Sequence, residues 1–333
     1  MKNYYGKVLK TNEDLKTSAC CTEESIPENI KAILKEIHPE VLTKYYGCGS
    51  PIPSALEGKT VLDLGSGSGR DCFILSKLVG PEGKVIGVDM TDEQLEIANS
   101  HISYHMERFG YDKPNIVFKK GYIEDLQEAG IESESVDVVI SNCVLNLSTD
   151  KKNAFSEIFR VLKPGGELYF SDIFSGRRIP EDLVKDPVLF GECLSGAMYI
   201  EDFRRLLISL GYNDYRTLSS RKVDLDNLEV KEKIGTIDFY SITVRVFKLP
   251  LEDRCENYGQ VATYKGTLEE TPDSFILDDH HEFKANVDIP VCSNTAAMLQ
   301  KTRFEKHFDV VGDLSTHYGP FKSSPAKIGG SCC

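Results

Sequence analysis

The sequence has no apolar run close to the roughly 18 residues that a membrane-spanning helix needs. Residues 1–16 also contain no apolar stretch of the kind that a secretory signal peptide carries. Positive charge is scarce: 39 Lys and Arg stand against 52 Asp and Glu, and the formal net charge is −13. This balance argues against the phosphates of nucleic acid and an anionic membrane as the main partners. We therefore expect a soluble, cytoplasmic protein, and we interpret it as a monomer.

Two cysteine patterns are also missing. Ten cysteines in 333 residues are too few for a disulfide scaffold. None has the C-x-x-C spacing of a zinc ribbon. Two interpretations remain, reduced thiols with a chemical role and buried small side chains.

Apolar strands alternate with helices over the first two thirds of the chain. The predicted strands are 60–64, 84–90, 115–121, 136–141 and 166–172. Continuously apolar strands that alternate with helices predict a mostly parallel sheet with helices on both faces. After about residue 220, apparent antiparallel strands within 236–249 and 260–268 predict a smaller α+β domain. The expected divisions are an N-terminal segment with a thiol pair (1–43), a catalytic domain (44–220), a C-terminal α+β domain (221–318) and a flexible tail (319–333).

A glycine loop, "VLDLGSGSGRD", joins the first strand to its helix. Its glycines, Gly65, Gly67 and Gly69, have G-x-G-x-G spacing, whereas a dinucleotide fingerprint is G-x-G-x-x-G. Asp63 precedes the first glycine, where it would repel a pyrophosphate and attract an ammonium group. Asp89 ends the second strand and could accept hydrogen bonds from both ribose hydroxyls. S-adenosylmethionine, a nucleoside joined to an amino acid, fits both carboxylates, and a tight turn without a ligand is the alternative.

Cys143, in "ISNCVLNL" (140–147), directly follows the fourth strand. In an open parallel sheet, ligands bind outside the carboxyl ends of the strands at the switch point, so this thiol would face the cofactor. A lone cysteine is more often a packing residue, but Cys48 and Cys193 could converge on this one. Three thiolates prefer a soft ion. Arsenic(III) keeps a lone pair that could attack a sulfonium methyl, and no His or Lys base would be needed.

Several motifs together carry a resemblance to known families. They are "KYYGCG" (44–49), "LDLGSGSGRDC" (62–72), "GYIE" (121–124), "SNCVLNL" (141–147), "GGELYFSD" (165–172) and "GECLSGA" (191–197). The glycine loop, Asp63, Asp89 and "LKPGGELYF" resemble the class I methyltransferases that use S-adenosylmethionine, with their Rossmann-like fold. The whole set resembles the arsenite methyltransferases, from about residue 20 to about residue 315.

The resemblance implies a set of site residues. Cys48, Cys143 and Cys193 would bind arsenic(III) and serve catalysis with a fourth thiol, either Cys20 or Cys21, of which we favour Cys20. The implied cofactor contacts are Tyr46, Asp63, Gly65, Ser66, Gly67, Gly69, Asp89, Met90, Tyr122, Ile123, Glu124 and Asn142.

The expected function is methyl transfer from S-adenosylmethionine to trivalent arsenic that arrives as a thiol conjugate. Glutathione or thioredoxin would be the thiol reductant, with thioredoxin a possible partner. A methyltransferase for another small soft acceptor, or a thiol-based metalloid-binding protein without turnover, is the alternative.

The other cysteines receive simpler interpretations. We expect Cys72 in the core, Cys255 and Cys292 to be structural, and Cys332 and Cys333 to be dispensable. His280 and His281 are expected in a solvated loop.

Overall fold

The computed structural model describes residues 26–44, 51–186, 189, 193–225 and 227–322. The elements that form the large sheet and its cover are α1 (Glu28–Leu34), α2 (Pro39–Thr43), β1 (Thr60–Leu64), α3 (Arg70–Val79), β2 (Lys84–Asp89), α4 (Asp92–Ser100), α5 (Ile102–Phe109), β3 (Ile116–Lys120), β4 (Val136–Asn142), η3 (Leu145–Leu147), α6 (Lys151–Val161), β5 (Leu162–Ser175), α7 (Glu181–Val184), β6 (Met198–Tyr199), α9 (Ile200–Ser209), β7 (Arg216–Lys222), α10 (Leu228–Ile234) and β8 (Phe239–Phe247). The remaining elements are β9 (Val261–Tyr264), β10 (Ser274–Asp278), β11 (His281–Lys284), β12 (Asp288–Pro290), α11 (Ser293–Gln300), η4 (Glu305–His307) and β13 (Phe308–Val311).

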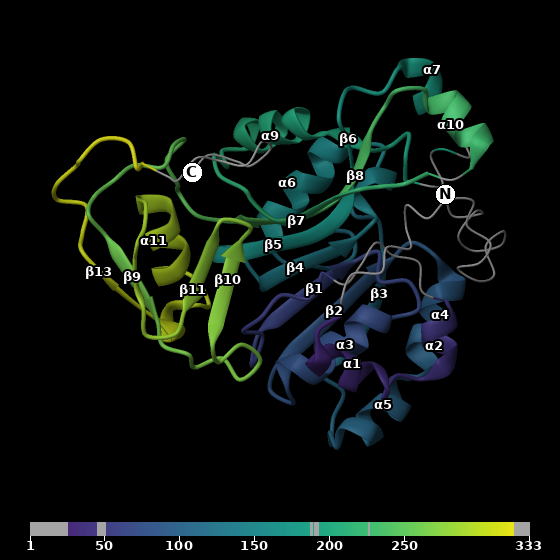
Figure 1. Ribbon diagram of the computed structural model, residues 1–333. Coiled ribbons are helices and arrows are strands. Elements are labelled where there is room, and N and C mark those ends of the chain that lie inside the picture. Colours follow the sequence, from purple (N-terminus) through teal and green to yellow (C-terminus); the bar gives the residue numbers. More distant parts are fainter. Residues whose placement is uncertain (1–25, 45–50, 187–188, 190–192, 226, 323–333) are drawn as a thin grey trace.

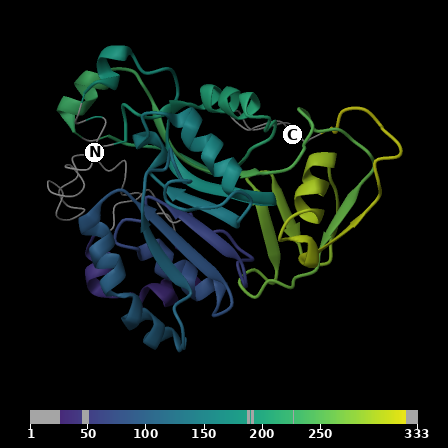
Figure 2. The same cartoon turned by 180° about the vertical axis from the view of Figure 1, so that it is seen from behind.

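The central sheet has the strand order β3-β2-β1-β4-β5-β8-β7, and β6 pairs with β5 beside this path. Strands β1 to β5 are parallel, as the apolar runs predicted. Successive residues of one strand face opposite sides of a sheet, and here they enter two different cores. Leu62 belongs to the core that includes residues of α6 and α9, whereas Val61 belongs to the core that includes residues of α1, α3 and α5. Helices thus cover both faces, as Figure 1 and the reverse view in Figure 2 show.

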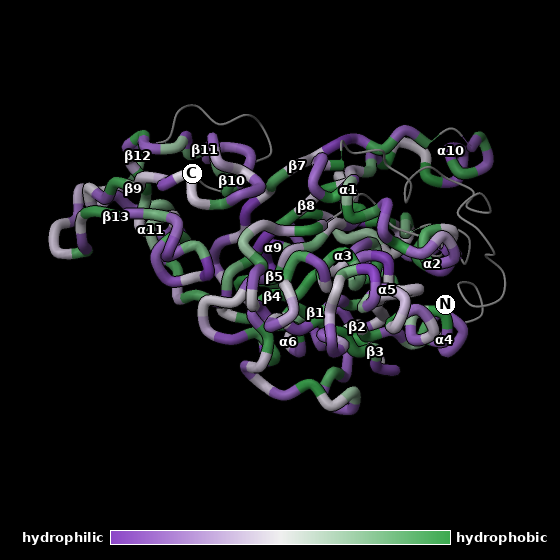
Figure 3. The backbone as a smooth tube through the Cα atoms, turned by 90° about the horizontal axis from the view of Figure 1, so that it is seen from below, coloured by the Kyte–Doolittle hydropathy of each residue, from purple (hydrophilic) through white to green (hydrophobic). Residues whose placement is uncertain are grey.

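Hydropathy follows this layering. In Figure 3 the apolar segments gather among the central strands, and hydrophilic segments dominate the outlying loops. Among the described residues, no helix is long and apolar enough to cross a membrane.

Strand β8 corrects one expectation. The sequence predicted an antiparallel strand within 236–249 and assigned it to the smaller C-terminal domain. The strand is antiparallel, but it lies in the central sheet between β5 and β7. Its pairing with β5 extends from Glu167↔Phe247 to Ser175↔Phe239, so it covers the edge of β5 that no parallel strand occupies. How the chain divides into domains otherwise stays a prediction.

The C-terminal elements form a separate α+β layer beside the sheet (Figure 1). Strands β12, β9 and β13 make an antiparallel sheet, β10 and β11 form a hairpin, and α11 lies among them. Their apolar core includes Phe275, Phe283, Phe304 and Phe308, together with Phe247 of β8. This shared core joins the C-terminal layer to the central sheet.

Two buried ionic clusters lie along that junction. On β5, Glu167 accepts a 2.5 Å hydrogen bond from Nε of Arg245 and pairs with Arg303 of the C-terminal layer. Burial alone would raise the pKa of Glu167, but these two guanidinium groups hold it below its usual value. Arg245 belongs to β8 of the central sheet and Arg303 to the C-terminal layer, so the ionised carboxylate is bound from both sides of the junction.

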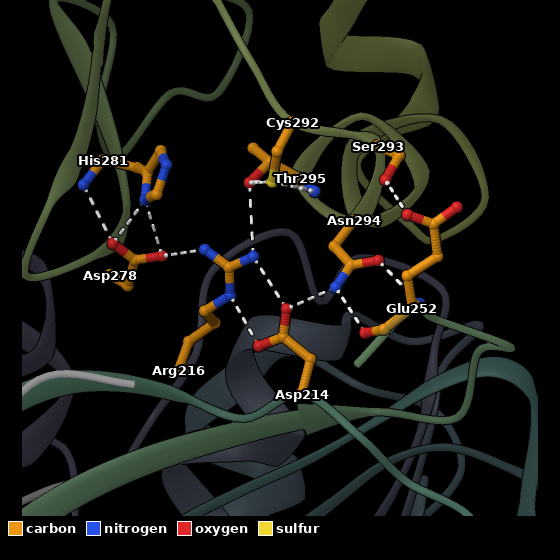
Figure 4. Close-up of polar contacts among 9 residues, drawn as sticks. All are labelled: Asp214, Arg216, Glu252, Asp278, His281, Cys292, Ser293, Asn294 and Thr295. Carbon is orange, nitrogen blue, oxygen red and sulfur yellow. Dashed lines mark hydrogen bonds and ion pairs between the residues drawn. The ribbon is translucent and has the colours of Figure 1, made fainter. Parts of the chain in front are cut away.

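Figure 4 shows the second cluster, which is centred on Arg216 of β7. Arg216 is 2.9 Å from Asp214 and 3.1 Å from Asp278, which ends β10. Nδ1 of His281 lies 2.7 Å from the Asp278 carboxylate, so His281 belongs to this buried cluster and not to the solvated loop expected from the sequence. Cys292 accepts from the Thr295 backbone N–H at 3.5 Å and caps α11, which agrees with the structural role expected for it.

Candidate active site

A cavity of about 390 Å³ opens at the carboxyl ends of β1, β2 and β4. Its lining includes Asp63, Gly65, Ser66, Gly67, Asp89, Met90, Tyr122, Ile123, Glu124, Asn142 and Cys143. The structure thus brings together around one cavity all the predicted cofactor contacts among its described residues, except Gly69. Tyr46 lies outside the described residues. This is the position that the topology of an open parallel sheet favours for a ligand.

The glycines of the loop serve two structural purposes, close packing at one position and an open backbone at another. Gly65, Gly67 and Gly69 all have positive φ (71°, 52° and 90°), a conformation that side chains with a Cβ rarely adopt. A Cβ at Gly65 would clash with the side chain of Val144, so this glycine permits close packing against the loop after β4. A Cβ at Gly67 would meet nothing within 4 Å, so here the backbone faces open space. Gly69 does not line the cavity; it stands at the start of α3.

Asp63 is a buried carboxylate at the floor of the cavity. Burial, followed by the nearby charge of Asp71, raises its pKa to about 8. The Cys72 thiol donates a hydrogen bond to its Oδ2 at 3.2 Å, so Cys72, which we expected in the core, is buried and also contacts the site. A cationic group in the cavity would favour the ionised form of Asp63. The site is therefore suited to a ligand that carries positive charge.

Asp89 ends β2 and organises the glycine loop. Its Oδ2 accepts from the Gly67 backbone N–H at 2.9 Å, and its Oδ1 accepts from the Thr91 N–H at 2.8 Å. Burial raises its pKa, although these hydrogen bonds act in the opposite direction. Each carboxylate oxygen can accept a further hydrogen bond. Asp89 can therefore hold the loop and also receive hydroxyl groups of a ligand.

Sequence reasoning missed several residues that line the cavity. They include Lys44, Ser68, Thr91, Gln94, Val144, Leu147, Ser148 and Thr149. Three buried polar atoms of the lining, Ser66 Oγ, Asp71 Oδ1 and Gln94 Oε1, have no hydrogen-bond partner among the described residues. Because buried polar groups are normally paired, these atoms mark where a polar ligand would bind. Gln94 lies in the first turn of α4, just beyond Asp89, and proximity to that strand end was the signal that could have found it.

Cys143 and Cys193 are brought together at one side of this cavity. Cys143 lines it, and the Cys193 thiol donates to the Cys143 carbonyl oxygen at 3.5 Å. Both are buried, and both have positive φ, 55° and 61°. Non-glycine residues in this region are strained, and such strain is concentrated at functional sites. Cys143 is also disulfide-bonded in the structure. Cys48, Cys20 and Cys21 lie outside the described residues.

Two polar side chains, Asp172 and Lys151, each support the turn that carries Cys143. Asp172, at the carboxyl end of β5, accepts from the Asn146 backbone N–H at 3.0 Å, and burial raises its pKa to about 7. Nζ of Lys151 donates to the carbonyl oxygens of Asn146 and Ser148 at 3.1 and 3.0 Å. The turn from Cys143 to Ser148 is therefore held from β5 and from the first turn of α6. Nothing in the local sequence indicated this support.

Comparisons with known proteins agree with this geometry. Residues 55–217 match the family model of a methyltransferase domain, and residues 257–327 match that of the arsenite methyltransferase C-terminal domain. The chain is 50% identical to an arsenite methyltransferase of Aquipseudomonas alcaligenes, covering 97% of this chain and 93% of that protein. It is 44% identical to an arsenite methyltransferase of Mus musculus, covering 92% and 82%.

Among solved structures, the chain is similar to the crystal structure of an arsenic(III) S-adenosylmethionine methyltransferase from Chlamydomonas reinhardtii. The TM-score is 0.87 and the identity 48%, and the match covers 90% of this chain and 100% of that one. The likeness therefore extends over both the central sheet and the C-terminal layer.

Proposed function

We propose that this chain, which belongs to the arsenite methyltransferase family, transfers methyl groups from S-adenosylmethionine to trivalent arsenic. The observation that carries the proposal is the position of two buried, strained cysteines, Cys143 and Cys193, beside a cavity lined by a glycine loop and by carboxylates. A methyl donor and a thiophilic acceptor could meet there. We expect the enzyme to act as a cytoplasmic monomer.

The cavity residues fit S-adenosylmethionine, which supplies a sulfonium methyl group. Asp63 would receive the ammonium of the methionine part, and Asp89 the ribose hydroxyls. Gly67 leaves its backbone open to the cavity, and Ser66 and Gln94 offer unpaired buried oxygens. Of the remaining expected contacts, Tyr122, Ile123 and Glu124 would lie along the adenine, and Tyr46 near the sulfonium.

Arsenic(III) would be held by Cys48, Cys143 and Cys193, with Cys20 or Cys21 as a fourth thiol. Arsenite has three exchangeable positions, so three thiolates can bind it, and its lone pair can attack the methyl carbon directly. After one methylation only two positions remain. We assign these to Cys143 and Cys193, since both lie at the carboxyl side of the central sheet.

A thiol reductant is the remaining requirement. Because Cys143 is disulfide-bonded in the structure, it can bind arsenic only after reduction. Two reductant thiols, from glutathione or thioredoxin, would supply the two electrons and two protons and leave as a disulfide. The arsenic would then enter as a thiol conjugate that exchanges its thiols for those of the protein.

The test is release of S-adenosylhomocysteine as a function of arsenite, with reductant present. We expect arsenite-dependent release by the wild type and none by Cys143→Ser. Cys332→Ser, in the C-terminal tail, is the matched control and should keep wild-type activity. Arsenite binding without release would indicate a metalloid-binding protein, and release with another soft acceptor but not with arsenite would indicate a different methyltransferase. Either result would overturn the proposal.

Cys48, Cys20 and Cys21 are expected to serve the first methylation more than the second. Cys48→Ser, and a double change of Cys20 and Cys21 to Ser, should block methylation of arsenite but leave some turnover of the monomethyl species. Chromatography with elemental detection measures both products. Equal loss with both substrates would contradict the division of roles proposed for these thiols.

A further inference from the structure

Three potential metal ligands gather outside the cavity, on the side of the molecule where α2 meets the junction of α4 and α5. His38 is the N-cap of α2, and Glu40 lies in its first turn. His101 stands between α4 and α5. One ligand atom from each of these side chains lies within 4.8 Å of the other two. The proposed function uses none of these residues.

The three groups are close together, although they do not yet have the arrangement of a coordination shell. Nε2 of His101 lies 2.8 Å from Oε2 of Glu40, and the imidazole rings of His38 and His101 are stacked, with centroids 3.8 Å apart and planes 23° apart. Ligand atoms around a tetrahedral Zn²⁺ with bonds of about 2.0–2.1 Å are separated by about 3.3 Å. Coordination would therefore draw the ligand atoms together and turn the two stacked rings until a nitrogen of each points at the same ion.

A buried third histidine fixes the backbone at both imidazole ligands. Nε2 of His105 accepts from the His38 backbone N–H at 3.2 Å. Its proton is therefore on Nδ1, which lies 2.7 Å from the carbonyl oxygen of His101 and donates to it. The His105 ring is itself stacked on Phe73 at 3.6 Å in the core. One rigid ring thus sets the positions of two ligand residues, the kind of support that metal sites require.

We propose that His38, Glu40 and His101 form a binding site for one divalent transition-metal ion, with Zn²⁺ as the preferred occupant. Two imidazoles and a carboxylate are ligands that Zn²⁺ accepts, and three protein ligands leave a fourth position for water. The Glu40 side chain is half exposed, so the ion and the water can reach the site from solvent. Coordination would replace the hydrogen bond that Nδ1 of His38 accepts from the Glu40 N–H.

A metal ion at this site would fix the position of α2, which is also linked to the cavity. Oγ of Ser68, in the glycine loop, donates to the Val41 carbonyl oxygen at 2.9 Å, and Lys44, just after α2, lines the cavity. An ion on His38 and Glu40 would hold this short helix against α4 and α5. The site is independent of the proposed methyl transfer, and its occupancy can be measured without activity.

The decisive experiment is a crystal soaked with Zn²⁺ and measured at the zinc absorption edge. We expect an anomalous peak within about 2.2 Å of a ring nitrogen of His38 and of His101, next to Glu40. Zn²⁺ also binds thiolates, so additional peaks at cysteines are expected, and they are not evidence for or against this site. Absence of a peak at these three residues would mean that they form only a histidine–glutamate ion pair, and the proposal would be wrong.

A solution experiment with Co²⁺ separates the two kinds of ligand, because thiolate coordination gives intense near-ultraviolet charge-transfer absorption and nitrogen–oxygen coordination does not. His101→Asn should remove one Co²⁺ equivalent, or weaken it at least about tenfold, and leave the thiolate absorption unchanged. Glu40→Gln is a second variant in case His101→Asn does not fold. His317→Asn, at an exposed histidine paired with Glu256, is the matched control. Unchanged Co²⁺ stoichiometry in both site variants would refute the site.

Discussion

Replacing Asp63 with Asn should stabilise the protein without ligand and weaken its binding of S-adenosylmethionine. The pKa of Asp63 is raised from 3.8 to about 8, first by burial and then by Asp71. Between these two values the unfolded chain binds fewer protons than the folded protein, so stability falls as the pH rises. The fall approaches about 1.4 kcal/mol per pH unit and flattens near pH 8.

Between pH 6 and pH 8, Asp63 should therefore cost the wild type about 2 kcal/mol of unfolding free energy. The amide that replaces the carboxylate in Asp63→Asn cannot ionise, so the variant should lack this part of the pH dependence. The pKa of Asp89 is also raised, and this carboxylate accounts for part of the slope that remains. In return, the variant loses the negative charge that would attract the ammonium group, and its affinity for S-adenosylmethionine should fall at least about tenfold.

Urea unfolding followed by circular dichroism at several pH values measures the first effect; the chain has no Trp to report by fluorescence. Calorimetry measures the second. Asp112→Asn, at an exposed position away from the cavity, is the matched control and should follow the wild type. If the wild type and Asp63→Asn lose the same stability between pH 6 and pH 8, the reasoning about Asp63 is refuted.

Three further predictions, with four substitutions, test other parts of the structure. Asp89→Ala removes the acceptor for Gly67 and Thr91 as well as the proposed ribose acceptor, so calorimetry should show S-adenosylmethionine affinity reduced at least about tenfold; unchanged affinity would contradict the role of Asp89. Cys143→Ser and Cys193→Ser should each abolish methylation of arsenite and of its monomethyl product, as separated by chromatography with elemental detection; wild-type turnover by Cys143→Ser would make that cysteine a packing residue. Arg303→Met should lower the free energy of unfolding by about 3–5 kcal/mol in urea, because it leaves the buried Glu167 with one guanidinium fewer; a change below about 1 kcal/mol would show that Arg245 alone suffices.

Local sequence signals predicted the strands and the glycine loop well. Strand β1 has the predicted bounds, and Val61, Leu62 and Leu64 make it apolar on both faces, as a central parallel strand requires. Residues 92–109 have the amphipathic pattern of one long helix, but the structure divides them at His101 into α4 and α5. The side chains of Asn99 and Ser100 donate to the carbonyl oxygens of Leu95 and Ile97, and such bonds compete with the helical ones. The apolar periodicity of the sequence does not reveal that these side-chain hydrogen bonds compete with the helical ones.

What the sequence could not predict depends on distant pairing. The edge of β5 is closed by β8, which no local pattern distinguishes from a strand of the C-terminal layer. In the local sequence, Glu167 is a charged residue within an apolar strand. Its ion-pair partners, Arg245 and Arg303, lie far along the chain, so no local pattern indicates them. Likewise, Lys151 and Asp172 support the Cys143 turn only because β5 and α6 lie beside it.

The closure of the sheet by β8 has a consequence for synthesis on the ribosome. Strand β5 emerges well before β8, so during translation one of its edges has no partner in the central sheet. An unpaired apolar strand edge is a template for aggregation. The nascent chain should therefore depend on chaperones until Phe247 has left the exit tunnel. For the same reason, a premature stop codon between β7 and β8 should yield an insoluble product, although every residue that lines the cavity would already have been made.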